Sequence, residues 1–213
     1  SEFTITGLQP NEERTYVATV TDEAGNVSAE RTVAIYKVSK SLNDAEIGFE
    51  EGFDYTYDGA AKTPTVTVSI AGATVPNTEY DVTYSNNTNA DTATVTITGK
   101  NTYSGTKTGN FAIAPKPVTA VVTVTDRTYD GTDKATVTAT VNDSDLETQG
   151  PTKDVVTITG VTGTFASANA GTQDVTINSA NMTVSNRNYD VTVPETIKGT
   201  INPLALTKFE IPG

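Results

Sequence analysis

The feature that most constrains the fold is a tetrapeptide, Thr-Tyr-Asp-Gly, which occupies residues 56–59 and returns at residues 128–131. Each copy precedes a segment in which Thr alternates with Val, and each such segment ends at a proline, Pro115 or Pro203. Self-similarity of this kind is typical of repeated structural units. The chain is therefore predicted to fold as an array of modules.

The tetrapeptide itself has the chemistry of a turn. Asp side chains bond nearby backbone amides, and Gly adopts positive φ without steric cost. The Tyr ahead of them can bury its ring while its hydroxyl reaches a backbone partner. We interpret both copies as fold-defining turns rather than as ligand sites.

The segments after the tetrapeptides have the period of a β-strand. In residues 65–70, Val66, Val68 and Ile70 alternate with hydroxyl side chains, which indicates a sheet with one buried and one solvated face. Long runs of helix-forming residues are absent, and β-branched Thr is abundant. The sequence predicts an all-β protein. The predicted strands are 16–20, 33–36, 45–49, 65–70, 80–84, 93–98, 111–113, 120–125, 135–141, 155–159, 173–177, 182–184, 189–193 and 197–201.

Strand spacing and the prolines predict the domain organisation. Short strands with frequent turns fit β-sandwich modules, and residues 115–117 (Pro-Lys-Pro) read as a stiff linker. We expect tandem Ig-like β-sandwiches in an elongated arrangement. The segments are residues 1–36, the end of one such domain; 37–115 and 116–203, two complete modules; and 204–213, the start of a further repeat.

Charge and composition restrict the partners. The formal net charge is −12, from 14 basic and 26 acidic residues, so the chain should repel phosphate backbones and anionic membranes. We therefore predict no nucleic-acid partner. No apolar run approaches the roughly 20 residues of a membrane span, which predicts no membrane insertion.

The same composition argues against catalysis and cofactors. The chain has no Cys and no His, so disulfides, thiolate ligands and the most common general base are excluded. No spacing among the acids favours a catalytic pair, and Trp, a frequent sugar-stacking residue, is absent. We predict that the protein is not an enzyme and that it holds neither a cofactor nor a metal.

Two kinds of structural site stay open as alternatives. Loop carboxylates and amides are ligands that Ca²⁺ accepts, but neither candidate stretch matches an EF-hand loop. The calcium alternatives are Asp143 with Asp145, and Asp22 with Glu23 and Asn26. An intramolecular Lys–Asn isopeptide bond is the other alternative, with Lys62, Lys107, Lys134 and Lys198 as donors.

Several motifs resemble a known family. They are Tyr-Asp-Gly at 57–59 and 129–131, residues 80–87, residues 99–105, Asn-Ala-Gly at 169–171 and Asn-Tyr at 188–189. Over residues 54–203 the chain resembles the bacterial Ig-like repeats named for their YDG motif, which occur in tandem in large surface proteins and secreted multimodular enzymes. Residues 1–36 resemble the end of a fibronectin III or bacterial Ig-like domain, through Leu8, Pro10, Tyr16 and the turn at 22–26.

The resemblance implies a function without catalytic residues. The leading expectation is an extracellular spacer, stalk or adhesive module of a large bacterial cell-surface protein, a monomer within a longer chain attached to the cell surface or wall. The alternative is an accessory module of a secreted carbohydrate-active enzyme that binds host or dietary glycans; a surface protein is the other expected partner. In that alternative, five tyrosines would stack on sugar rings unless they pack in the core. They are Tyr55, Tyr57, Tyr80, Tyr84 and Tyr103.

Overall fold

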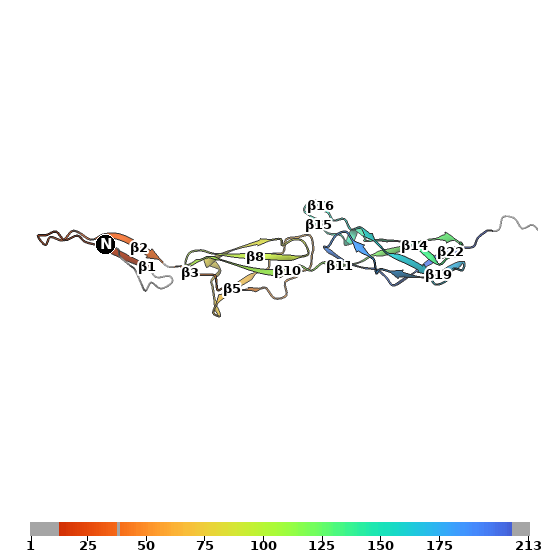
Figure 1. Ribbon diagram of the computed structural model, residues 1–213, viewed down its shortest axis with the longest axis horizontal. Coiled ribbons are helices and arrows are strands. Elements are labelled where there is room, and N and C mark those ends of the chain that lie inside the picture. The colour runs from red at the N-terminus through yellow and green to blue at the C-terminus, as the bar shows by residue number, and fades with distance from the viewer. Residues whose placement is uncertain (1–12, 38, 206–213) are drawn as a thin grey trace, which may run out of the picture. The chain divides into compact units, whose positions relative to one another are not determined.

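A computed structural model describes residues 13–37 and 39–205, and these residues are nearly all β-strand and turn (Figure 1). Within them there is no α-helix, only two 3₁₀ turns, η1 (Asn77–Glu79) and η2 (Asp143–Asp145). The all-β prediction is confirmed for this part of the chain. In the described ranges no helix is long or apolar enough to cross a membrane. Leu8 and Pro10, which carry part of the resemblance, and most of segment 204–213 lie outside the described residues.

The chain forms two compact units, and the segments that belong to each unit alternate along the sequence. Unit 1 contains the described residues up to Asp54, together with Thr63–Asn87 and Thr92–Phe111. Unit 2 contains Tyr55–Lys62, Thr88–Asp91 and the chain from Ala112 onward. The first Thr-Tyr-Asp-Gly copy therefore belongs to unit 2, although strands of unit 1 precede and follow it in the sequence.

Unit 1 consists of short antiparallel sheets with one parallel pair. Its hydrogen-bonded orders are β1-β2, β4-β5-β6, β10-β8-β7 and the parallel pair β3-β9. The strands are β1 (Glu13–Ala18), β2 (Arg31–Lys37), β3 (Lys40–Ser41), β4 (Glu46–Phe49), β5 (Val66–Ile70), β6 (Ala73–Thr74), β7 (Tyr80–Ser85), β8 (Thr92–Gly99), β9 (Tyr103–Ser104) and β10 (Thr106–Ala112).

The turn after β1 follows from its residue types. Asp22 accepts hydrogen bonds from the backbone and side-chain nitrogens of Asn26, each at 2.8 Å, and Gly25 adopts a φ of +85°. These bonds lower the pKa of the Asp22 carboxyl, the side-chain bond from Asn26 most of all. Gly25 thus supplies the positive φ of the turn at 22–26.

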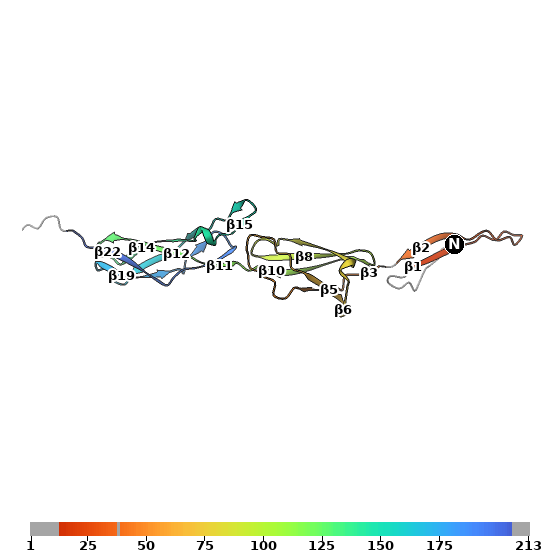
Figure 2. The same cartoon turned by 180° about the vertical axis from the view of Figure 1, so that it is seen from behind.

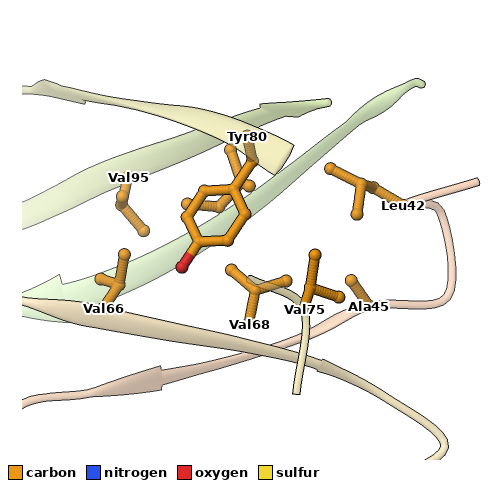
Figure 3. Packing of buried hydrophobic residues seen from close by; sticks show 8 residues of the cluster. Leu42, Ala45, Val66, Val68, Val75, Tyr80 and Val95 are labelled. Carbon is orange, nitrogen blue, oxygen red and sulfur yellow. The ribbon is translucent and has the colours of Figure 1, made fainter. Parts of the chain in front are cut away.

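The core of unit 1 confirms the alternation read from the sequence. Val68 is fully buried and Val66 is 8% exposed, whereas Thr67 between them is exposed. Facing strands β7 and β8 contribute Tyr80, Val95 and Ile97. Figure 3 shows the Tyr80 ring lying among valines of the two layers.

Unit 2 is built on one large sheet with smaller pairs around it. The strands are β11 (Lys116–Thr119), β12 (Val121–Thr125), β13 (Arg127–Thr128), β14 (Lys134–Thr140), β15 (Thr148–Gln149), β16 (Thr152–Lys153), β17 (Ile158–Thr159), β18 (Thr162–Phe165), β19 (Gly171–Asn178), β20 (Thr183–Val184), β21 (Tyr189–Thr192) and β22 (Thr196–Asn202). Figure 2 shows this unit from behind, with β15 labelled; β15 pairs antiparallel with β16.

The large sheet of unit 2 is nearly closed on itself. Its order is β12-β14-β18-β19-β22-β13, so β12 and β13 lie at opposite ends. Only Asp126 separates these two strands in the chain, so the sheet must curl to bring its ends together. The curled sheet encloses a core in which Val175 and Ile201 are fully buried and Phe165 is 2% exposed. A nearly closed barrel-like sheet is the observed form, whereas the tandem Ig-like sandwich arrangement is not established.

The segment at Pro115–Pro117 differs from its prediction. It was expected to be a linker, but Lys116–Thr119 form strand β11, which pairs in parallel with β21. The amide of Lys116 donates to the carbonyl of Asn188 at 2.8 Å, and the next residue, Pro117, needs no donor because alternate amides of a strand face away from one partner. Proline at the edge of a sheet therefore stiffens a strand here.

Other elements were also missed in the sequence, among them strand β18 and the elements of stretch 142–153. Strand β18 contains Gly163, and a glycine weakens the sequence pattern of a strand. The glycine is needed there because a Cβ at this position would lie only 2.6 Å from the side chain of Val137. The polar stretch 142–153, where the sequence predicted no strand, contains η2, β15 and β16.

Candidate functional site

The two Thr-Tyr-Asp-Gly copies form the same turn. Asp58 Oδ1 accepts a hydrogen bond from the amide of Ala60 at 3.0 Å, and Asp130 Oδ1 accepts one from Thr132 at 2.9 Å. The glycine of each copy has a φ of +79°. Both copies are thus Asx turns with a left-handed glycine, as their residue types predict. Hydrogen bonds from Thr132, helped by the nearby Arg127, lower the pKa of Asp130.

The tyrosines of the two copies have the same backbone role and different surroundings. The amide of Tyr57 donates to the carbonyl of Ala114 at 2.9 Å, and that of Tyr129 donates to Asn202 at 2.8 Å. The Tyr57 side chain is 1% exposed, whereas that of Tyr129 is 42% exposed.

The hydroxyls of Tyr57 and Tyr189 share one hydrogen-bond acceptor, the carboxylate of Asp154. The Tyr57 hydroxyl donates to Asp154 Oδ2 at 2.5 Å, and the hydroxyl of Tyr189 donates to the same oxygen at 2.8 Å. Gln149 Nε2 donates to the Tyr57 hydroxyl at 2.8 Å. The two tyrosine rings meet edge to face, with centroids 5.7 Å apart. A polar network this well satisfied fixes the position of each member.

Further hydrogen bonds hold the acidic stretch 142–153 against Tyr189 and Lys116. The amide of Glu147 donates to the Tyr189 hydroxyl at 2.7 Å. Lys116 Nζ in turn donates to Glu147 Oε1 at 2.5 Å and to the carbonyl of Asp145 at 2.8 Å. The acidic stretch 142–153 is thereby tied to strands β11 and β21.

The segment Thr88–Asp91 is held by side chains of unit 2, among them the buried amide of Asn188. Asn188 is 6% exposed; its Oδ1 accepts from the amide of Ala90 at 2.8 Å and its Nδ2 donates to Asn89 Oδ1 at 3.0 Å. Gln149 Nε2 also donates to Asn89 Oδ1, at 2.9 Å. We call Gln149, Asp154, Asn188 and Tyr189 the acceptor surface.

The electrostatics keep both tyrosines protonated. Burial raises the pKa of Tyr57, and its hydrogen bond to the Asp154 carboxylate raises it further. Burial likewise raises the pKa of Tyr189, again with a contribution from Asp154. Each hydroxyl therefore serves as a hydrogen-bond donor at neutral pH, and the arrangement is suited to fixing chain segments in place.

The five tyrosines of the glycan hypothesis do not form one set. Tyr80, Tyr84 and Tyr103 belong to unit 1, where Tyr80 is 6% exposed and the other two pack against the core. Tyr84 donates to the carbonyl of Pro64, and Lys40 Nζ lies 5.5 Å from the ring centre of Tyr103. Tyr80 and Tyr84 also line a hollow of about 260 Å³. The other two tyrosines, Tyr55 and Tyr57, belong to unit 2, Tyr55 half-buried and Tyr57 buried.

The calcium candidates can be placed as well. Asp143 and Asp145 lie in η2, and Asp22 is bonded to Asn26. Across the described ranges, no group of three or more His, Cys, Asp or Glu side chains is placed to hold a metal.

The four lysines considered for a cross-link differ widely. Lys62 is 4% exposed and its ammonium lies 2.8 Å from Asp58. Lys198 pairs with Asp174 at 2.7 Å. Of the remaining two, Lys107 donates to the backbone carbonyl of Asn43 at 3.1 Å and Lys134 is exposed.

Sequence reasoning missed most of the acceptor surface. Asn188 and Tyr189 were noticed only as a motif of the resemblance, with Tyr189 also at the start of a predicted strand, and neither Gln149 nor Asp154 was singled out. Residues 80–83 and 189–192 share the sequence Tyr-Asp-Val-Thr, but their strands are not equivalent, because β7 pairs antiparallel with β8 and β21 pairs in parallel with β11. Nothing local to residues 142–153 indicates that Tyr57 binds there.

Comparison with known families gives one match. The YDG domain family matches residues 114–197, which are 84 of the 213 residues. No curated protein and no solved structure matches the chain. The match lies entirely within unit 2 and covers less than half of the chain.

This match corrects the function inferred by resemblance. The name YDG is that of the SRA-YDG domain, a DNA-binding domain, and so the match does not support Ig-like repeats of bacterial surface proteins. The spacer, stalk, adhesin and cell-wall interpretations are withdrawn on this finding, and so is the glycan-binding alternative. The exclusion of nucleic acid as a partner is withdrawn as well. The extracellular location and the lack of enzyme activity are untested and stay predictions.

Proposed function

We propose that unit 2 is a non-catalytic binding module, with nucleic acid as the ligand class. The match of residues 114–197 to the YDG domain family is the observation that supports this proposal. The site geometry agrees with a role other than catalysis, because the buried tyrosines and Asp154 satisfy one another.

The charge of the matched region limits how nucleic acid would be bound. Residues 114–197 contain five basic and ten acidic side chains. Three of the basic ones lie in ion pairs, namely Lys116 with Glu147, Arg127 with Asp130 and Arg187 with Asp91. The other two, Lys134 and Lys153, are exposed. Contacts to phosphates would thus be few, and bases or sugars would supply most of the affinity.

The salt dependence of binding tests this proposal. With two phosphate contacts, a plot of the logarithm of the binding constant against the logarithm of the salt concentration has a slope of about −1.8. The affinity should therefore fall only about tenfold between 50 and 200 mM salt. Fluorescence anisotropy with labelled 12-nucleotide single strands and duplexes, with and without methylated cytosine, measures it on the full chain. Lys134→Gln with Lys153→Gln should weaken binding and flatten the slope. No binding at about 100 µM protein in 50 mM salt would refute the proposal.

We also propose that each unit is an Ig-like sandwich, in tandem along the chain. The proposal is supported by the paired short sheets of unit 1 and by a parallel strand pair in each unit, β3-β9 in unit 1 and β11-β21 in unit 2. A crystal structure of the full chain tests it, and a closed single-sheet barrel in either unit would contradict it.

A further inference from the structure

We propose that the surface around Tyr129 is a docking face for a second copy of the acceptor surface. The proposal is independent of nucleic-acid binding. It rests on a comparison, within unit 2, of the segments that hold the two Thr-Tyr-Asp-Gly copies. We call Tyr57, Gly59, Asn89 and Ala90 the first face, and Tyr129, Gly131, Asn169 and Ala170 the second face.

The two faces have matching sequences and backbone roles. Besides the tetrapeptide, each contains an Asn-Ala pair just before a long strand, residues 89–90 before β8 and 169–170 before β19. In each, the tyrosine amide bonds the last carbonyl before a proline, that of Ala114 or of Asn202. The second face is therefore the structural repeat of the first.

The faces differ in what covers them. Ala90 is 7% exposed and Tyr57 1%, whereas Ala170 is exposed and Tyr129 is 42% exposed. A lysine lies five residues after each tyrosine and shows the same difference in burial: Lys62 is buried, whereas Lys134 is exposed.

The two glycines give an independent measure of the same difference. A Cβ built on Gly59 would lie 2.7 Å from the carbonyl oxygen of Thr148, beside the acceptor surface. A Cβ built on Gly131 would meet nothing within 4 Å. The turn is the same in both, so the difference comes from the packed neighbour.

The polar groups of the second face are arranged to make the bonds that the first face makes. Tyr57 donates to Asp154, and Asn89 Oδ1 accepts from Asn188 and Gln149. Among the described residues, the Tyr129 hydroxyl and Asn169 Oδ1 make no such bond. A partner that fits them presents a carboxylate for the tyrosine and two amide donors for the asparagine, which is the acceptor surface itself.

The occupant to which we commit is therefore a β unit equivalent to residues 116–203. The test protein is the chain up to Pro203, followed directly by a second copy of residues 116–203. Lys116 of the added copy then follows Pro203 just as Lys116 follows Pro115 in the native sequence. In the added copy, Tyr129→Phe removes the second Tyr129, so that the nitration measured at this position comes from the original Tyr129 alone. Nitration of tyrosines, mapped by mass spectrometry, reports the exposure of each ring.

In the unmodified chain, Tyr129 should be nitrated readily and Tyr57 should resist. In the extended chain, the rate at Tyr129 should fall at least tenfold, toward that of Tyr57. An unchanged rate at Tyr129 would overturn the proposal. Because Tyr57 is read in the same molecules, loss of its protection would identify general unfolding.

Ala170→Arg provides the matched control. Ala170 is exposed, so the substitution should leave the melting temperature of the unmodified chain unchanged. In the extended chain it should restore nitration of Tyr129, since the equivalent Ala90 is buried when docked. Protection of Tyr129 that persists despite Ala170→Arg would also overturn the proposal.

Discussion

At the scale of single residues, one carboxylate organises the candidate site. Asp154 Oδ2 accepts from both Tyr57 and Tyr189, and the rings of these tyrosines contact each other. A carboxylate that loses one buried donor leaves an unsatisfied group, which costs about 1–3 kcal/mol. The stability of unit 2 should therefore depend on the protonation of these hydroxyls.

Alkaline pH should destabilise the protein through Tyr57 and Tyr189. Their pKa values are raised in the folded state, so the unfolded chain loses these protons first, from about pH 10 upward. The stabilising contribution is thus complete below pH 10 and lost as pH rises above it. Urea denaturation at pH 7, 9 and 10.5 measures the free energy of unfolding. Tyr57→Phe should lower it at pH 7 by about 1–3 kcal/mol and reduce its fall above pH 10.

Tyr129→Phe is the control for that experiment, because Tyr129 is exposed. It should change neither the stability at pH 7 nor the alkaline slope. Equal slopes in the Tyr57→Phe and native chains would contradict the role given to Tyr57.

At the scale of elements, one turn serves in two environments. Residues 56–59 and 128–131 have the same Asx bond and the same glycine φ, yet only the first packs against stretch 142–153. Local sequence thus decides the conformation of the turn, and the segments around it decide its burial.

Substitution of the two glycines should separate these contributions. Gly131→Ala should destabilise by about 1–2 kcal/mol, the cost of a left-handed conformation for a residue with a Cβ. Gly59→Ala carries the same cost and adds a clash with Thr148, for about 1–3 kcal/mol more. Thermal and urea denaturation of both variants measure the difference. Equal destabilisation would show that the packing around Gly59 is not rigid.

At the scale of the whole molecule, charge is the dominant property. The net charge of −12 makes the folded state repel itself, and exposed ion pairs such as Lys198 with Asp174 offset little of this. Salt weakens both the repulsion and the ion pairs, and with 26 acidic against 14 basic residues we expect the loss of repulsion to be the larger effect.

Salt should therefore stabilise the protein. Raising sodium chloride from 20 to 500 mM shortens the Debye length to a few ångströms and should raise the melting temperature by about 2–5 °C. Differential scanning calorimetry measures the shift, with sucrose as a control for non-ionic effects. A lower melting temperature in high salt would mean that ion pairs outweigh the net repulsion.

Much of the fold follows from the sequence because its causes are local. The alternation in 65–70 gave the buried face of β5, and Asp58 and Asp130 gave their turns. Strand β11 was missed because a proline pair reads as a linker, and only its pairing with β21 shows otherwise. The function inferred from resemblance was overturned by the family match, since the motifs that carried it are turn and strand residues.

The sequence by itself determined the strand class, the turn at each Thr-Tyr-Asp-Gly copy and the acidic surface. These depend on side-chain period, residue type and charge, which neighbours in the chain supply. Only the tertiary structure decided that Tyr57 is buried and Tyr129 exposed, because Asp154 and Gln149 lie more than 90 residues from Tyr57 in the chain. Contacts over such separations depend on how the sheet closes, which no local pattern records.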